Sequence, residues 1–175
     1  RHTAGSSDST ADRVMPLADP GDLVGRTWHL ALGDGRVLEP AGIGSVLTSY
    51  LTQEHFLTVT AVDGADITLM IALAEEGSST TQDLDSNTVT LPTLDFSGQP
   101  FLEGGPFDGV SMGVAGYDVT FDDFTFEGTF APDGSAIGGI TMSGLMDTRP
   151  LAPLIDSSGD PGAICDLAVS FGAAC

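Results

Sequence analysis

Alternation of apolar and polar residues is the clearest pattern in the chain, and it predicts antiparallel strands. Across residues 57–73 apolar residues recur at every second position on both sides of an Asp-Gly pair, as in a hairpin with one buried face. A three-residue loop ending at Gly64 would pair Val59 with Ile67. A two-residue Asp-Gly turn would set apolar against polar faces, so we do not expect it.

Other segments repeat this alternation, separated by turns that are rich in glycine and proline. We expect further strands at residues 27–32, 88–96, 110–114, 117–121 and 124–130, and a return strand after the turn at 131–135. Pro92 interrupts the second of these strands. Residues 97–108 are predicted to be a loop because glycine and proline are frequent there.

The long strand near residue 120 changes phase in its middle. Phe121 belongs to one face, whereas Phe124 and Phe126 belong to the other. Such a slip predicts a β-bulge at Asp122-Asp123. Carboxylates could converge at a bulge, but solvated bulge residues are the simpler interpretation. The face that we expect to be buried contains Phe124, Phe126, Ile140 and Met142.

Apolar residues spaced by three and four predict short helices at residues 41–52 and near the C-terminus. Asp160-Pro161 is typical of a helix start and Gly172 of a helix end. The apolar stripe of this last helix would consist of Ile164, Leu167, Ala168 and Phe171.

These elements predict a mainly β protein, an antiparallel meander that is either barrel-like or a sandwich, with short helices including a C-terminal one. Residues 1–22 have the composition of a polar tail. Residues 23–175 form one β-rich domain, with a helical segment at 148–175. The chain has 175 residues, of which 41% are hydrophobic, enough for a real core.

The charge is strongly one-sided. All 5 basic residues are arginine, against 25 Asp and Glu, for a net charge of −20. Such a chain repels phosphate backbones and anionic lipids, so we expect no nucleic-acid partner. It favours cations, and calcium above all. A genome rich in GC or a saline habitat would produce the same composition without any site. No apolar run is long enough to span a bilayer.

Residues 109–113 (Gly-Val-Ser-Met-Gly) match the G-x-S-x-G pattern of hydrolases around Ser111. That motif requires a strand–turn–helix context and a histidine later in the chain. The three histidines, His2, His29 and His55, all precede Ser111, whose surroundings predict a strand. We therefore interpret the match as chance and expect no catalytic residues and no enzyme.

Residues 83–87 copy the opening of a calcium loop. Asp83, Asp85 and Asn87 follow the D-x-D-x-N spacing, but Thr88 replaces the glycine and Leu94 the bidentate glutamate. A looser calcium site here, or at Asp156 and Asp160, is the only metal-binding hypothesis. No other cofactor is expected.

The two cysteines lie late in the chain. The spacing of Cys165 and Cys175 does not suit a CxxC redox or zinc site. We predict a disulfide between them, formed in an oxidising compartment; two free buried thiols are the alternative.

Gly25-Arg26-Thr27-Trp28 resembles the G-x-W signature at the first strand of lipocalins. That resemblance implies an up-and-down barrel around an apolar ligand.

Residues 23–175 also resemble secreted or lipoprotein-type envelope proteins of Gram-negative bacteria with GC-rich genomes. The segments that carry this resemblance are residues 37–40 (Val-Leu-Glu-Pro), 49–53, 142–151 and 160–165. It implies an extracellular, outer-membrane-surface or periplasmic location and no particular reaction. Such proteins typically have an acylated cysteine before a low-complexity spacer, whereas this chain has the spacer but begins at Arg1, which argues against a lipid anchor.

The combined expectation is a non-enzymatic extracellular or envelope protein, a structural or accessory subunit of a surface assembly. Residues 1–22 lack the apolar content to order by burial. We expect them to contact a protein partner or a second copy. The alternative is a lipocalin-like module that binds a small apolar ligand.

Overall fold

The computed structural model describes residues 17, 19–38, 48–49, 52–156 and 158–172. Within them, one nine-stranded antiparallel sheet runs in the order β1-β2-β3-β5-β6-β8-β7, with β4 paired to β3 and β9 to β8. The strands are β1 (Thr27–Leu30), β2 (His55–Asp63), β3 (Asp66–Leu73), β4 (Val89–Thr90), β5 (Leu94–Asp95), β6 (Phe101–Phe107), β7 (Val110–Val114), β8 (Tyr117–Phe130) and β9 (Ile137–Met146). The predicted antiparallel meander is confirmed, as an open sheet.

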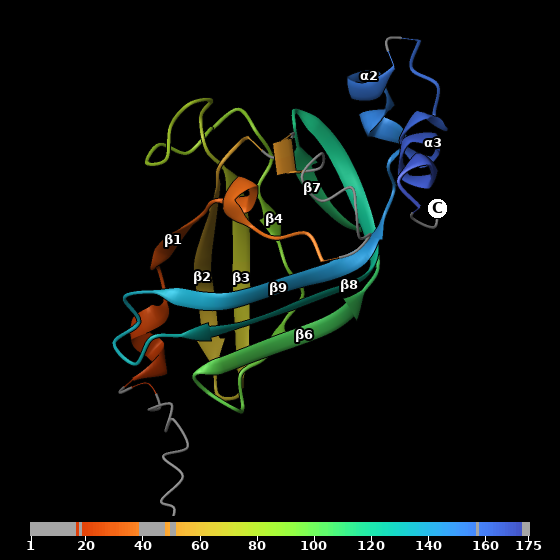
Figure 1. Cartoon of the computed structure of the whole chain (residues 1–175). Coiled ribbons are helices and arrows are strands. Elements are labelled where there is room, and N and C mark those ends of the chain that lie inside the picture. Colours follow the sequence, from red (N-terminus) through yellow and green to blue (C-terminus); the bar gives the residue numbers. More distant parts are fainter. Residues whose placement is uncertain (1–16, 18, 39–47, 50–51, 157, 173–175) are drawn as a thin grey trace, which may run out of the picture.

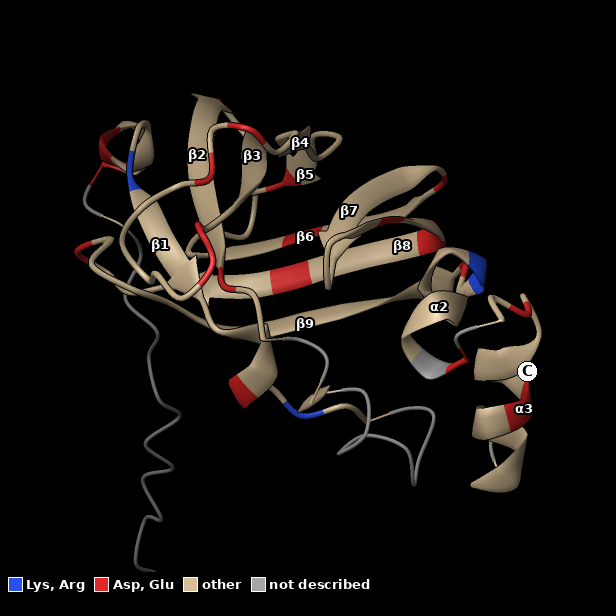
Figure 2. Ribbon diagram, turned by 90° about the horizontal axis from the view of Figure 1, so that it is seen from above, with Lys and Arg blue, Asp and Glu red and all other residues tan. Residues whose placement is uncertain are grey.

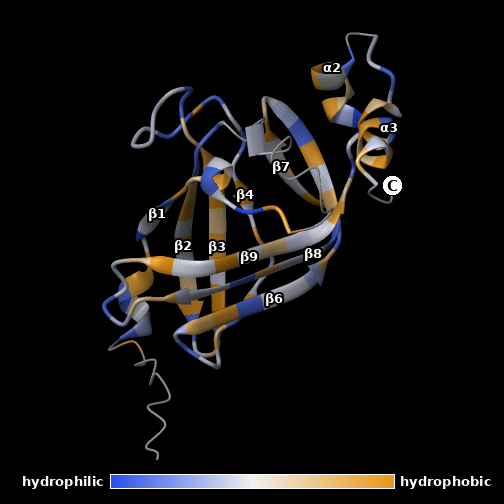
Figure 3. Cartoon of the chain, viewed as in Figure 1, coloured by the Kyte–Doolittle hydropathy of each residue, from blue (hydrophilic) through white to orange (hydrophobic). Residues whose placement is uncertain are grey.

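The sheet curls so that its second half lies over its first half. In Figure 1, β6, β8 and β9 cross in front of β2 and β3. One long strand makes this possible: β8 pairs with β6 and β7 along one edge and with β9 along the other. The apolar faces of both halves therefore meet, and Figure 3 shows hydrophobic residues along the strands that enclose this space.

Aromatic side chains fill the interior. Phe96, Phe124, Phe126 and Phe130 are each about 1% exposed. The ring of Phe130 lies 5.1 Å from that of Trp28 and 5.8 Å from that of Phe96. The predicted buried face is confirmed for Phe124 and Phe126, and the half-buried Ile140 and Met142 pack against the same cluster.

The register of the first hairpin differs from the prediction. β2 and β3 are joined at Asp63 and Asp66, and Val59 pairs with Leu69 instead of Ile67. Gly64 has the expected positive φ, 61°, but a bulge between Val59 and Ala61 adds one residue to β2. This bulge restores the match of apolar faces that a short turn alone would break.

Residues 101–107, predicted to lie in a loop, form strand β6. Its register shifts between Gly104 and Phe107, where the strand passes Phe124 of β8. Gly105 has φ 110° and approaches so closely that a Cβ would lie 2.3 Å from the Phe124 carbonyl oxygen. Glycine is therefore required at this position by packing. The high glycine and proline content of the segment had predicted a loop instead.

Two other local predictions are confirmed. Pro92 separates β4 from β5. A register shift follows Asp122 in β8, and Asp123 has φ 51°. Two carboxylates bind backbone amides at this bulge: Asp122 Oδ1 accepts from the Gly109 amide at 3.0 Å, and Asp108 Oδ1 from the Asp123 amide at 3.2 Å.

Short helices lie at both ends of the sheet: the 3₁₀ turns η1 (Pro20–Leu23), η2 (Leu32–Asp34) and η3 (Arg149–Leu151), and the α-helices α2 (Ala152–Ile155) and α3 (Ala163–Ser170). Leu17 and Leu23, from the boundary of the predicted tail, are buried in the main core. Ile164 and Ala168 of α3 are buried, but Phe171 is 48% exposed. Most of the predicted helix at 41–52 lies outside the described residues, and no described helix is long and apolar enough to cross a membrane.

Candidate functional site

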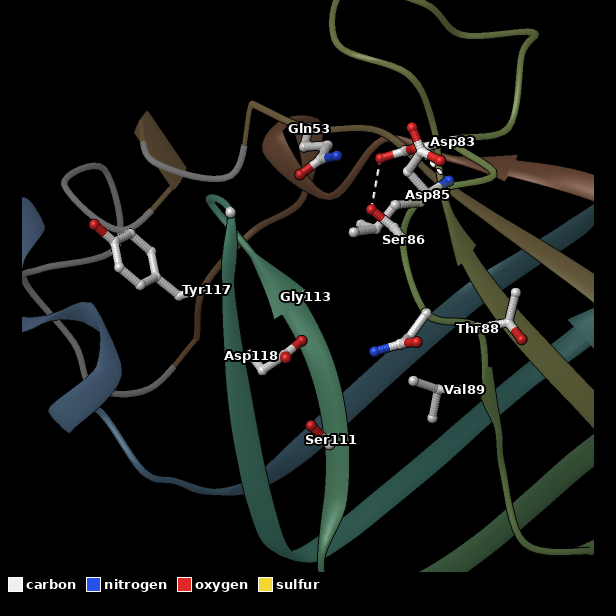
Figure 4. A pocket seen from close by; sticks show the side chains of 13 residues that line it. Gln53, Asp83, Asp85, Ser86, Thr88, Val89, Ser111, Gly113, Tyr117 and Asp118 are labelled. Atoms are coloured by element: carbon white, nitrogen blue, oxygen red, sulfur yellow. Dashed lines mark hydrogen bonds between the residues drawn. The ribbon is translucent and has the colours of Figure 1, made fainter.

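A polar pocket of about 510 Å³ lies where the loop of residues 82–88 faces the β7–β8 hairpin. We call it the hairpin–loop pocket. Figure 4 shows Asp83, Asp85 and Ser86 on the loop and Ser111 and Asp118 on the hairpin, across the pocket from each other. The side chains or backbone that line it belong to Gln53, Leu73, Asp83, Asp85, Ser86, Asn87, Thr88, Val89, Ser111, Gly113, Gly116, Tyr117 and Asp118.

The loop is attached to the end of β3. The Asp83 amide donates to the carbonyl oxygen of Leu73 at 2.9 Å, and Ala74 forms a bridge with Gln82. Gln53, just before β2, donates through Nε2 to the carbonyl oxygen of Ala74 at 3.1 Å. These contacts explain why a polar segment holds a fixed position beside the sheet.

The Asp83 carboxylate organises the loop. Its Oδ1 accepts from the Asp85 amide at 2.9 Å, and its Oδ2 from the Ser86 hydroxyl at 2.5 Å. The Ser86 hydroxyl, followed by the Asp85 amide, lowers the pKa of Asp83 below its usual value, because both donate to the ionised form. Asp83 thus shapes the turn, while the exposed Asp85 and Asn87 present their side chains at the pocket.

Strand alternation decides which hairpin residues face the loop. Gly113 pairs with Asp118 and Ser111 with Thr120, so these four share one face. Tyr117 belongs to the opposite face and packs against Leu151 and its neighbours; in Figure 4 its ring points away from the loop. The turn between the strands uses positive φ at Ala115 and Gly116.

His55 lies beneath the hairpin. It is 3% exposed, and its Nε2 lies 3.1 Å from the carbonyl oxygen of Gly113. A carbonyl oxygen only accepts, so Nε2 carries the proton. Burial lowers the pKa of His55, against the opposing effects of the carbonyls of Gly113 and Gln53 and the charge of Glu54. The close fit also needs Gly113, where a Cβ would lie 2.6 Å from Leu73 Cδ1.

The G-x-S-x-G segment has no hydrolase geometry. Ser111 lies in the middle of β7, paired across the ladder with Thr120, and not on a strand–turn–helix elbow. The histidines of the described chain are engaged elsewhere: His29 Nε2 contacts Glu54 Oε2 at 2.8 Å, and His55 contacts Gly113. Ser111 is therefore an exposed residue of a regular strand.

The structure places the two calcium candidate sets in different parts of the fold. Asp83, Asp85 and Asn87 line the same pocket. Asp156 and Asp160 lie between α2 and α3, where they accept from the amides of Ser158 and Gly162, each at 2.9 Å. Within the described ranges, no three His, Cys, Asp or Glu residues are placed to hold one metal ion.

The cysteine prediction falls partly outside the described residues. Cys165 is half-buried on α3, and Cys175 belongs to residues 173–175, which the structure leaves out. The disulfide stays a prediction.

Sequence reasoning missed Asp118, Gln53 and His55. Asp118 could have been found: the predicted turn at residues 115–116 already pairs it with Gly113 and sets it on the face of Ser111. The positions of Gln53 and His55 depend on the curl of the sheet, for which no local pattern exists.

Comparison with known proteins gave no match to a family model, a curated protein or a solved structure.

Proposed function

We propose that this chain is a non-enzymatic extracellular or envelope protein, a structural or accessory subunit of a surface assembly that acts through its exposed faces. One observation carries the proposal: the interior is filled by aromatic rings, whereas the polar groups able to recognise a partner lie on open faces and loops. The envelope location rests on the sequence resemblance, and the strong acidity of the surface, visible in Figure 2, favours solubility and selective contact.

The lipocalin-like alternative needs an apolar cavity under the first strand. Trp28 packs instead on Phe130 with ring centres 5.1 Å apart, and Phe124 is about 1% exposed. The sheet is also open, with β1 and β9 each paired to one strand in the described part of the chain. These observations favour a surface-acting protein over a ligand carrier.

Assembly is tested by the native mass of the purified protein and by what co-purifies with it from its source. Size-exclusion chromatography with light scattering, at low and high salt, should show a complex or a self-associated species. Deleting residues 1–12 should weaken this association and leave the melting temperature nearly unchanged. A monomer at every concentration, with no co-purifying protein, would refute the proposal.

Calcium is a second proposal for the hairpin–loop pocket, which Asp83, Asp85 and Asn87 line from the loop and Asp118 from the hairpin. Isothermal titration with CaCl₂ tests it. Binding that is lost in Asp85→Asn and kept in Asp156→Asn would assign calcium to this pocket, whereas equal loss in both variants would point to diffuse attraction by the surface.

A further inference from the structure

Five carboxylates form a continuous row across the outer face of the sheet. In the strand register, Asp63 of β2 pairs with Asp66 of β3, Asp66 with Asp95 of β5, Asp95 with Glu103 of β6, and Glu103 with Glu127 of β8. We call this row the acidic ladder. Register partners point to the same side of a sheet, and all five side chains are exposed. Figure 2 shows acidic segments on each of the neighbouring strands β5, β6 and β8.

The residues next to the ladder confirm which way it faces. Ile67, Leu94, Leu102 and Phe126 each follow or precede a ladder residue and are at most 1% exposed. The ladder is therefore the solvent side of strands whose other side is core.

The arrangement is unfavourable for the isolated domain. Like charges directly opposite each other destabilise a sheet, and here four such pairs follow one another. Neither of the ion pairs in the described residues, His29–Glu54 and Arg149–Asp147, includes a ladder carboxylate. A cationic partner would remove this repulsion and gain attraction at every step of the ladder.

An exposed aromatic ring lies beside the ladder. Phe101 is 50% exposed. It precedes Glu103 by two positions in a regular stretch of β6, where Phe101 pairs with Thr129 and Glu103 with Glu127. Both side chains therefore stand on the same face, with the buried Leu102 between them. A ring beside carboxylates suits arginine, whose guanidinium both stacks on an aromatic face and pairs with carboxylates.

A groove lies on this face beside the acidic ladder. It has a volume of about 640 Å³ and is lined by Asp95, Glu103 and Glu127 together with Gly104, Gly105 and Phe107.

We propose that the acidic ladder and Phe101 form a docking surface for an arginine-rich segment of a partner protein. The inference rests on the proposed function in that the occupant is a protein. It adds the location of the contact and the chemistry of the partner, and its residues are other than those of the N-terminal segment 1–22.

The probe is an eight-residue peptide in which four arginines alternate with serines, titrated against the full chain at low salt. The ladder variant Asp95→Asn/Glu103→Gln/Glu127→Gln changes the net charge from −20 by three. The matched control Asp34→Asn/Glu76→Gln/Asp166→Asn removes the same charge at exposed positions outside the ladder. We expect the ladder variant to bind roughly tenfold more weakly than the wild type and the control to bind as the wild type does.

Two further comparisons separate this contact from general attraction to an acidic surface. Phe101→Ala should weaken binding of the arginine peptide more than binding of the corresponding lysine peptide. A citrulline peptide should not bind. The ladder variant should melt at or above the wild-type temperature, because like-charge neighbours have been removed, so weaker binding will not reflect unfolding.

Equal losses in the ladder variant and the control would overturn the proposal. Binding of calcium to the ladder without binding of the peptide would overturn it too, since the ladder would then be a metal-binding face. Either result leaves the proposed function standing if the protein still assembles with a partner. If the peptide binds at the ladder while the native protein is a monomer without partners, the proposed function fails instead.

Discussion

His55 of β2 donates through Nε2 to the carbonyl oxygen of Gly113 in β7, at 3.1 Å. This bond connects two strands that are not neighbours in the sheet, and it fixes the hairpin that forms one wall of the pocket. It is made by a buried side chain whose pKa is lowered by burial. The position of the pocket therefore depends on a titratable side chain whose neutral form is favoured by burial.

The first prediction concerns this histidine and pH. Because the pKa of His55 is lower in the folded than in the unfolded chain, its contribution to stability is complete above the unfolded value of about 6.5 and is lost as the pH falls below it. Equilibrium urea unfolding at pH 7 and pH 5 should show a smaller free energy of unfolding at pH 5. His55→Gln can donate the same hydrogen bond without titrating, and the difference between the two pH values should shrink.

His55→Leu separates the bond from the titration. It leaves the Gly113 carbonyl without this donor, which should cost about 1–3 kcal/mol at pH 7. If His55→Leu is as stable as the wild type, the Gly113 contact contributes nothing and the hairpin is fixed by other contacts.

The second prediction concerns the core. Phe126 is about 1% exposed and belongs to the main cluster, so Phe126→Ala should reduce the free energy of unfolding by about 3–5 kcal/mol. Phe101→Ala, on the exposed side of the neighbouring strand, provides the control and should cost much less. A loss below about 1 kcal/mol for Phe126→Ala in denaturant melts would contradict the interior described above.

How far the sequence predicts this structure depends on how local each feature is. The bulge at Asp122-Asp123 and the face of Phe124 and Phe126 follow from alternation, because side-chain direction in a strand has a period of two. The register of the β2–β3 hairpin cannot be predicted from alternation. An extra residue in β2 compensates for the shorter turn, and apolar residues are buried both in the predicted register and in the observed one.

The candidate site divides in the same way. The D-x-D-x-N pattern of residues 83–87 identified the loop that lines the pocket. A turn at residues 115–116 would also have predicted that Asp118 lies at the site. The contact of His55 with Gly113 and the five-membered acidic ladder depend on which strands are neighbours. That order is set by the whole sheet, since β5, β6 and β8 are separated by other segments in the chain.

The third prediction is the Cys165–Cys175 disulfide. Cys165 lies near the start of α3, and the helix ends at Ser170 before Gly172 with φ 81°, which allows the chain to turn back. Intact-mass measurement with alkylation, with and without reduction, should show no alkylated thiol until the protein is reduced. The bond closes a short loop, so its removal should lower stability only modestly. Two thiols that alkylate in the native protein would refute the bridge and weaken the case for an oxidising compartment.

The last prediction separates two reasons for glycine in the segment around β6. Gly105 and Gly109 both have positive φ, 110° and 71°, so alanine at either position is strained. Around Gly109 a Cβ would meet nothing within 4 Å, whereas at Gly105 it would lie 2.3 Å from the Phe124 carbonyl oxygen and 2.9 Å from Thr125 Cα. Gly109→Ala should therefore cost only the backbone strain, about 1–2 kcal/mol. Gly105→Ala should cost that amount and about 1–3 kcal/mol more, because backbone atoms of β8 must move. Denaturant melts of the two variants measure the difference directly. Equal losses would mean that β6 can move away from β8 without cost, and the close approach of these strands would then not explain the glycine.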